Sequence, residues 1–239
     1  MKDLNTYISL SNEKISSIDD YITEKLKIRK SSHAYFPKTK EELQDILKQL
    51  IKERCNNGDF NDIDTSEITD MSELFKDMDK FNGDISKWDV SNVTNMRYMF
   101  YMCKSFNQQL NDWDVSNVTD MYCMFLCCEL FNQPLNNWNV SNVKTMGGMF
   151  YNCYKFDQPL NDWDVSNVKY MQETFEWCKK FNQPLNNWNV SKVEDMRQMF
   201  YGCRDYKQNL DDWKLNNIKN YKMMFDESPL ENNKPKWYK

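Results

Sequence analysis

Pairs of carboxylate and amide side chains flank a row of tryptophans, and they are the residues of this sequence most able to take part in chemistry. The flanking pairs are Lys87 and Asp89, Asp112 and Asp114, Asn137 and Asn139, Asp162 and Asp164, Asn187 and Asn189, and Asp212 and Lys214. Two neighbouring carboxylates suit acid–base catalysis only where their surroundings separate the two pKa values. These pairs are predicted to face solvent, so we expect no catalytic residues. Their oxygens could also hold calcium, although no D-x-[DN]-x-[DN]-G loop is present.

The acidic pairs alternate with amide pairs along the sequence. Like charges at adjacent positions of a sheet repel each other, so the interleaved asparagines have a purely structural explanation. The same residues also form an acidic, asparagine-rich strip that would attract a partner with lysine or arginine side chains. Both explanations remain open. Under the second, the binding residues are Asp89, Asp112, Asp114, Asn137, Asn139, Asp162, Asp164, Asn187 and Asn189.

Eight cysteines offer another kind of chemistry. Five recur at one fixed interval (Cys103, Cys128, Cys153, Cys178 and Cys203), and Cys55, Cys123 and Cys127 are additional. No C-x-x-C pair occurs and the one histidine, His33, lies outside the repeats, so we predict no metal site and no cofactor. The repeated thiols are interpreted as small buried apolar groups. Only Cys123, at a helix position that is polar in other copies, is expected to be exposed and reactive.

Charge and composition exclude several classes of protein. The chain of 239 residues has a net charge of −5, with +2 in residues 1–55 and −7 in the remainder. An acidic body lacks the basic footprint that nucleic-acid binding needs. No apolar run is long enough to span a membrane. Residues 1–14 show neither a signal-peptide core nor a nearby cysteine for a lipid anchor, so we expect a cytoplasmic protein as encoded.

A sequence repeat with a constant period positions all of these groups. The tryptophans Trp88, Trp113, Trp138, Trp163, Trp188 and Trp213 follow one another at the same interval as the cysteines, which indicates stacked repeats. In the copy at 131–155, the alternation around Trp138 predicts a short strand with the indole inward. Apolar spacings of three and four predict a short helix over 146–153.

Each repeat is expected to add nine side chains to a continuous core. In the copy at 131–155 they are Phe131, Leu135, Trp138, Val140, Val143, Met146, Met149, Phe150 and Cys153. We interpret the tryptophan row as structural core, because polar neighbours alternate with each indole. Trp177 lies outside this register and is the tryptophan to inspect for exposure.

The unit FNQPLNNWNVSNVKTMGGMFYNC strongly resembles the 25-residue BspA-like leucine-rich repeat of bacterial surface and lipoprotein-associated proteins, through W-x-V-S-x-V, M-x-x-M-F and the terminal cysteine. The resemblance covers residues 56–230 and implies a leucine-rich-repeat-like solenoid with binding or adhesion roles and no catalysis. It makes the cell surface or secretion the alternative location. The predicted fold class is α/β: a solenoid with one short parallel β-strand and one short helix per repeat, and an N-terminal helical cap.

Three segments are expected along the chain. They are an N-terminal helical cap segment (1–55), a solenoid of one degenerate and six full repeats (56–230), and a C-terminal tail or cap (231–239). A capping helix is predicted over 37–55 with Thr39 as its N-cap, and another helix over 14–30. Trp237 and Tyr238 are placed to fold over the last copy.

Together these patterns predict a non-catalytic, monomeric module that binds a protein partner with basic groups through the strand face. One alternative is a structural or adhesion protein that self-associates or attaches to a surface. The other is an enzyme, which would need a pocket with converging titratable groups.

Overall fold

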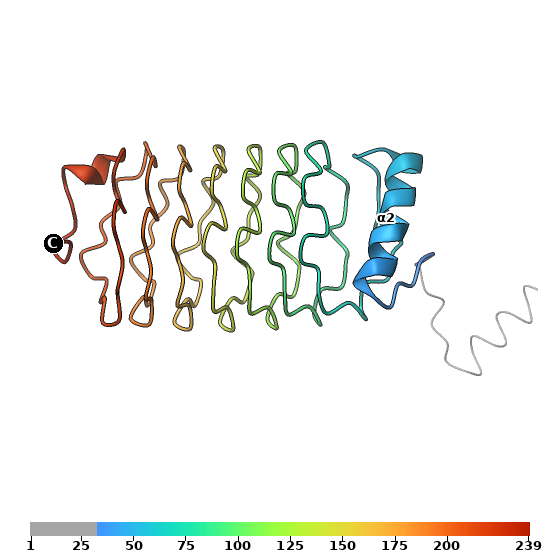
Figure 1. Ribbon diagram of the computed structural model, residues 1–239, viewed down its shortest axis with the longest axis horizontal. Helices are drawn as coiled ribbons and strands as arrows, with labels where there is room; N and C mark the ends of the chain where they lie inside the picture. The colour runs from blue at the N-terminus through green and yellow to red at the C-terminus, as the bar shows by residue number, and fades with distance from the viewer. Residues whose placement is uncertain (1–32) are drawn as a thin grey trace, which may run out of the picture. The chain divides into compact units, whose positions relative to one another are not determined.

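The computed structural model describes residues 33–239, and the chain divides into two compact units, residues 1–34 and 35–239. The helix predicted over 14–30 lies outside the described residues. The second unit begins with the α-helix α2 (Lys40–Arg54) and continues as a row of stacked coils (Figure 1). A short 3-10 helix, η1 (Pro229–Glu231), follows the last full coil.

The sequence accounts for the position of α2. Oγ1 of Thr39 accepts a hydrogen bond from the N–H of Glu42 at 3.2 Å, as an N-cap does. The helix ends at Arg54, and its C-cap residue, Cys55, has a positive φ of 62°. Its apolar stripe faces the first coil, with the side chains of Leu43, Leu47 and Leu50 buried.

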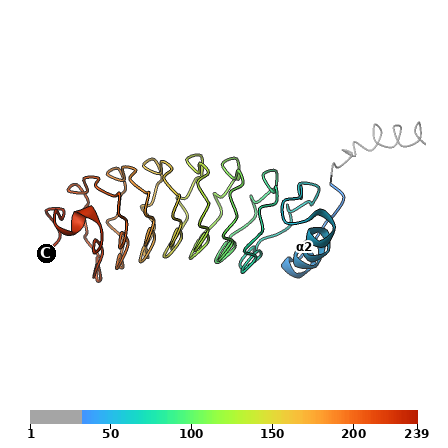
Figure 2. The same ribbon diagram turned by 90° about the horizontal axis from the view of Figure 1, so that it is seen from above.

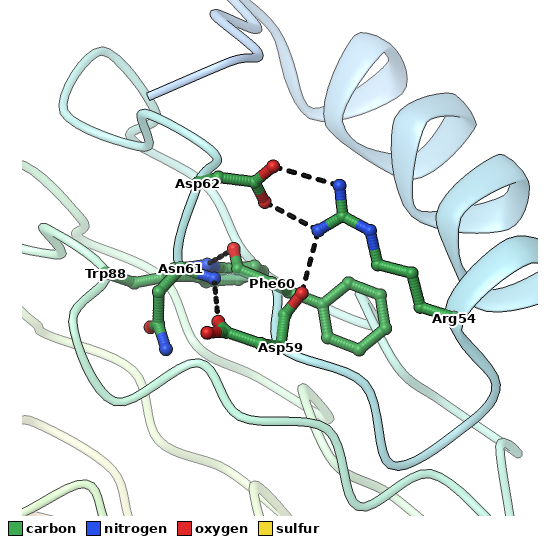
Figure 3. A network of polar contacts seen from close by, with 6 residues as sticks. All are labelled: Arg54, Asp59, Phe60, Asn61, Asp62 and Trp88. Carbon is green, nitrogen blue, oxygen red and sulfur yellow. Dashed lines mark hydrogen bonds and ion pairs between the residues drawn. The ribbon is translucent and has the colours of Figure 1, made fainter. Parts of the chain in front are cut away.

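Arg54, in the last turn of α2, ties the helix to the first coil (Figure 3). Its two terminal nitrogens donate to the two carboxylate oxygens of Asp62 at 2.7 and 2.9 Å, and Nη1 also donates to the carbonyl of Asp59 at 2.7 Å. The hydrogen bond to Asp62 raises the pKa of Arg54. A bidentate guanidinium–carboxylate pair fixes orientation as well as distance. The pair therefore helps to set how α2 packs on the first coil.

Successive coils stack in register, each one a single sequence repeat further along the chain. Parallel bridges join Asp70 to Asn95 and Asn95 to Asp120, and the series continues at the same step to Asn220. Seen from above, the coils of this unit follow a shallow arc (Figure 2).

The predicted α/β fold class, with one strand and one helix in every repeat, is wrong. Within residues 33–239 the repeats consist of turns and isolated bridges, and α2 is the only α-helix. Around Trp138 the chain makes two turns: the N–H of Trp138 donates to the carbonyl of Leu135, and that of Val143 to the carbonyl of Val140. The side chains still alternate between inside and outside, which is why the pattern imitated a strand.

The segment predicted as a helix, 146–153, is a run of turns. We call it, together with the equivalent segments of the other coils, the turn ladder. Backbone N–H groups alternate here between two kinds of hydrogen bond. One set donates to carbonyls of the next coil: Met146, Gly148, Phe150 and Asn152. The other set donates to a carbonyl three residues earlier and closes a turn within its own coil: Met149, Tyr151 and Cys153. A helix would keep all of these bonds in one segment. Gly148 (φ 62°) and Asn152 (φ 58°) take the left-handed backbone that interrupts the helix.

The core is one set of side chains copied along the row. All nine inward residues of the copy at 131–155 are at most 3% exposed. The rings of Trp138 and Trp163 stack with centroids 6.3 Å apart, and those of Phe125 and Phe150 at 5.7 Å. Each indole N–H of the row also donates to a carbonyl of the preceding coil, as Trp138 does to Leu110 at 2.8 Å. Tryptophan therefore both fills the core and pairs a buried carbonyl.

The C-terminal segment takes the next place in this row. The ring of Trp237 stacks on Trp213 at 6.3 Å, and its N–H donates to the carbonyl of Leu210 at 2.6 Å. Tyr238 packs against Phe225 at 5.4 Å. These contacts close the last coil with aromatic side chains.

Candidate functional site

The residue that follows each tryptophan closes a local turn. Its Oδ1 atom accepts a hydrogen bond from the N–H of the serine two residues later, at 3.0 to 3.2 Å, in Asp89, Asp114, Asn139, Asp164 and Asn189. Hydrogen bonds from Ser116 and Ser166 lower the pKa values of the Asp114 and Asp164 carboxyls. Aspartate and asparagine make the same turn, so this column of predicted site residues has a structural role.

The residue that precedes each tryptophan is exposed. This column contains Lys87, Asp112, Asn137, Asp162, Asn187 and Asp212. Within the described part of the chain, the carboxylates of Asp112 and Asp162 have no hydrogen-bond or ion-pair partner. The side chains of Asn137 and Asn187 contact the adjacent asparagine side chains. We call the exposed column at 112, 137, 162 and 187 the acidic strip, because the fold leaves its charges unused.

The side chains of the five repeated cysteines are buried in the core. The thiol of Cys153 donates to the carbonyl of Phe125 at 3.0 Å, and the other repeated cysteines make the same contact. Burial raises the pKa of the Cys153 thiol well above its ordinary value. The expectation of an exposed, reactive Cys123 is wrong, because its side chain is 3% exposed and burial raises its pKa to about 12. Of the cysteines, Cys55 is the exposed one.

A second surface, the outer side of the turn ladder, is not evident from the sequence reasoning. Its partly exposed aromatic residues are Tyr98, Tyr101, Tyr122, Tyr151, Trp177 and Tyr201. The guanidinium of Arg97 lies over the rings of Tyr98 and Tyr122, at 4.8 and 4.3 Å. Trp177, the tryptophan outside the register, is half-buried and meets Tyr201 edge-on at 5.4 Å. The available signal was that aromatic residues recur at positions of the repeat that the core does not use.

A buried acid lies among these rings. Glu176 is 5% exposed, and burial together with the charge of Glu173 raises the pKa of its carboxyl to about 7, against a hydrogen bond from Tyr151. Oε2 of Glu176 and Oε1 of Gln172 are buried, and neither has a hydrogen-bond partner among the described residues. Glu173 is paired, since its carboxylate lies 3.6 Å from Nε of Arg197. Glu176 therefore has an oxygen that the fold does not satisfy.

Comparison with known families gives a match over residues 42–154 and 131–237, to the family described as "Mycoplasma protein of unknown function, DUF285". The chain belongs to this family. The two DUF285 matches overlap within the copy at 131–155 and together reach from α2 to Trp237, so the DUF285 sequence pattern corresponds to the stacked coils. Comparisons with curated proteins and with solved structures gave no match.

The residues that the structure describes in this DUF285 protein also bear on metal binding and on membrane insertion. Among the described residues, no three histidine, cysteine, aspartate or glutamate side chains are grouped so that they could hold a metal ion. The same part of the chain has no helix with the length and apolarity needed to cross a membrane.

Proposed function

We propose that this DUF285 protein is a non-catalytic module that binds another protein through the acidic strip. The observation that carries the proposal is the difference between the two columns beside the tryptophans. The carboxylate of Asp114 is used by a turn, whereas those of Asp112 and Asp162 are exposed and have no partner within residues 33–239. Stacked repeats commonly bind partners along such extended surfaces.

Charge defines the partner. Exposed carboxylates at one position of alternate coils form a line of negative charge, which steers a partner with lysine or arginine side chains. Because a single exposed ion pair contributes about 0–1 kcal/mol, binding must combine several coils. Asn137 and Asn187, between and beside the acids, add amide groups that both donate and accept hydrogen bonds.

The proposal includes a monomer, and the two ends of the row support it. Helix α2 covers the first coil through Leu43, Leu47 and Leu50, and Trp237 stacks on the last indole. A row covered at both ends offers no bare coil for end-to-end stacking. Light scattering over a range of protein concentrations tests this point, and mass that grows with concentration would favour the self-associating alternative.

Two matched double variants test the acidic strip. Asp112→Asn with Asp162→Asn removes two unused charges, and Asp114→Asn with Asp164→Asn removes two charges from the turn column. Both pairs copy residues found in the amide coils, so both proteins should keep the wild-type unfolding midpoint. A partner is first captured from the source cell with the wild-type protein. Its dissociation constant is then measured for the wild type and for each variant.

The variant with Asp112→Asn and Asp162→Asn is expected to bind that partner with at least fivefold lower affinity than wild type. The loss should be larger at 50 mM than at 300 mM salt, because screening already removes part of the attraction at high salt. The second pair should lower the affinity less. Equal affinity of wild type and both variants at low salt would show that the acidic strip does not contribute to binding this partner.

A further inference from the structure

The outer side of the turn ladder carries a binding site that is separate from the acidic strip. We propose that the surface around Glu176 receives an arginine or lysine side chain of a protein partner, with its cationic group against Tyr151 and Tyr201 and its N–H groups directed at the Glu176 carboxylate. The site does not depend on the acidic strip, and goes beyond the function proposed for it.

Unpaired acceptors indicate the chemistry of the ligand. Buried polar atoms nearly always have a hydrogen-bond partner, and one without a partner destabilises the fold. Oε2 of Glu176 and Oε1 of Gln172 are both acceptors, they lie four residues apart in one coil, and both are buried without a donor from residues 33–239. A group that brings donors and no acceptor suits the Glu176 carboxylate, and lysine and arginine are the side chains of that kind.

Aromatic rings on both sides of Glu176 suit the same cation. Tyr151 and Tyr201 occupy the equivalent position in the coils before and after it, and both are partly exposed. The ring of Tyr201 is braced by the edge of Trp177 at 5.4 Å, and its hydroxyl donates to Glu227 at 2.9 Å. A cation within about 6 Å of such a ring face is attracted to it electrostatically. The negative charge of Glu173, which acts on Glu176, adds to the attraction.

The protein makes this type of contact within its own chain at one end of the same face. Arg97 lies over Tyr98 and Tyr122 and is 3.8 Å from the carboxylate of Asp120. In the coil of Glu176 and in the coil before it, the position of Arg97 is taken by Gln172 and Gly147, which carry no charge.

The next cation in this column is already engaged. Arg197 lies 3.6 Å from Glu173 and 2.9 Å from Asp195. Arg204 lies over the ring of Trp177 at 5.8 Å, but no cation of residues 33–239 forms an ion pair with Glu176. The rings and the acid are therefore present around Glu176, and we infer that the cation paired with this acid comes from a partner.

Peptide titrations of the full chain test the proposal. The probes are a glycine–serine peptide with one central arginine and the same peptide with citrulline, which keeps the shape of arginine and lacks its charge. NMR titration is expected to give at least fivefold tighter binding of the arginine peptide to wild type. Glu176→Gln should reduce that ratio to about one, whereas the Asp112→Asn, Asp162→Asn protein should keep it.

A second pair of variants covers the case in which Glu176→Gln does not fold. Tyr201→Leu removes a ring and should lower the ratio, and Tyr201→Phe keeps the ring and should preserve it. A ratio of one in the wild type, or an unchanged ratio in folded Glu176→Gln, overturns the proposal. So does a concentration-dependent dimer that Glu176→Gln dissociates, because the occupant would then be a second copy of the chain.

Discussion

The hydrogen bond from each indole to the coil before it can be separated from the packing of the ring. Trp138 is 3% exposed, and its N–H donates to the carbonyl of Leu110 at 2.8 Å. Trp138→Phe keeps an aromatic ring and leaves that buried carbonyl without a donor, which costs about 1–3 kcal/mol. The smaller ring adds a cavity of about 1 kcal/mol. We expect a total loss of about 2–4 kcal/mol, against about 3–5 kcal/mol for Trp138→Ala.

Urea unfolding followed by circular dichroism measures both losses, provided that the slope of free energy against urea is unchanged between variants. Trp237→Phe is the control, because Trp237 makes the same bond to Leu210 at 2.6 Å but is only partly buried. Water can replace its N–H there, so we expect a loss below about 1.5 kcal/mol. If Trp138→Phe lay within about 0.5 kcal/mol of wild type, or cost no more than Trp237→Phe, the carbonyl would not need the indole and the reasoning would fail.

Three further predictions concern the outer positions. The raised pKa of Glu176 means that its carboxyl holds a proton more tightly in the folded than in the unfolded chain, so ionisation destabilises the fold increasingly as the pH rises from about 4.5 to 7. The unfolding free energy of Glu176→Gln should exceed that of wild type by up to about 3 kcal/mol at pH 8 and by nothing at pH 4. Parallel profiles of unfolding temperature against pH for the two proteins would contradict this. Gly148→Ala should cost about 1–3 kcal/mol, because φ is 62° and the new Cβ would lie 2.8 Å from Sγ of Cys123; adding Cys123→Ala should recover part of the loss in a double-mutant cycle. Asp114→Ala should lose about 0.5–2 kcal/mol of the unfolding free energy with its turn, and Asp112→Ala less than about 0.5 kcal/mol; equal losses would mean that the turn bond contributes nothing.

The sequence determined which side chains lie inside, because burial follows spacing. The nine core positions of the copy at 131–155 needed only the period of the repeat and the local alternation. The backbone that carries them was not predictable from the same pattern. Spacings of three and four place Met146, Met149, Phe150 and Cys153 on one side of a helix, and they do so equally on a run of turns.

A signal against a helix was present at two positions. Gly148 and Asn152 are residues that tolerate left-handed backbone, and both have positive φ. Most other copies place larger side chains there, such as Tyr98 and Glu173 at the first position and Met102 and Trp177 at the second, which hid the signal. The difference between Asp112 and Asp114 was equally hidden, because both are exposed aspartates beside one indole. In the structure, Asp114 accepts a hydrogen bond from the N–H of Ser116, two residues later, and Asp112 accepts no such bond from residues 33–239.

The constant sequence separation spanned by each indole hydrogen bond determines how proteins of this kind can change in length. Every bond of the row from Trp88 to Trp213 joins residues 28 apart, one coil and three residues. Removing residues 131–155 would therefore present Trp163 with the carbonyl of Leu110 in place of Leu135. Duplicating the same block would give each new indole an equivalent carbonyl. The array can thus grow or shrink by whole coils while every buried carbonyl of the row keeps its donor, so insertions and deletions of one complete repeat should be tolerated where those of any other length are not.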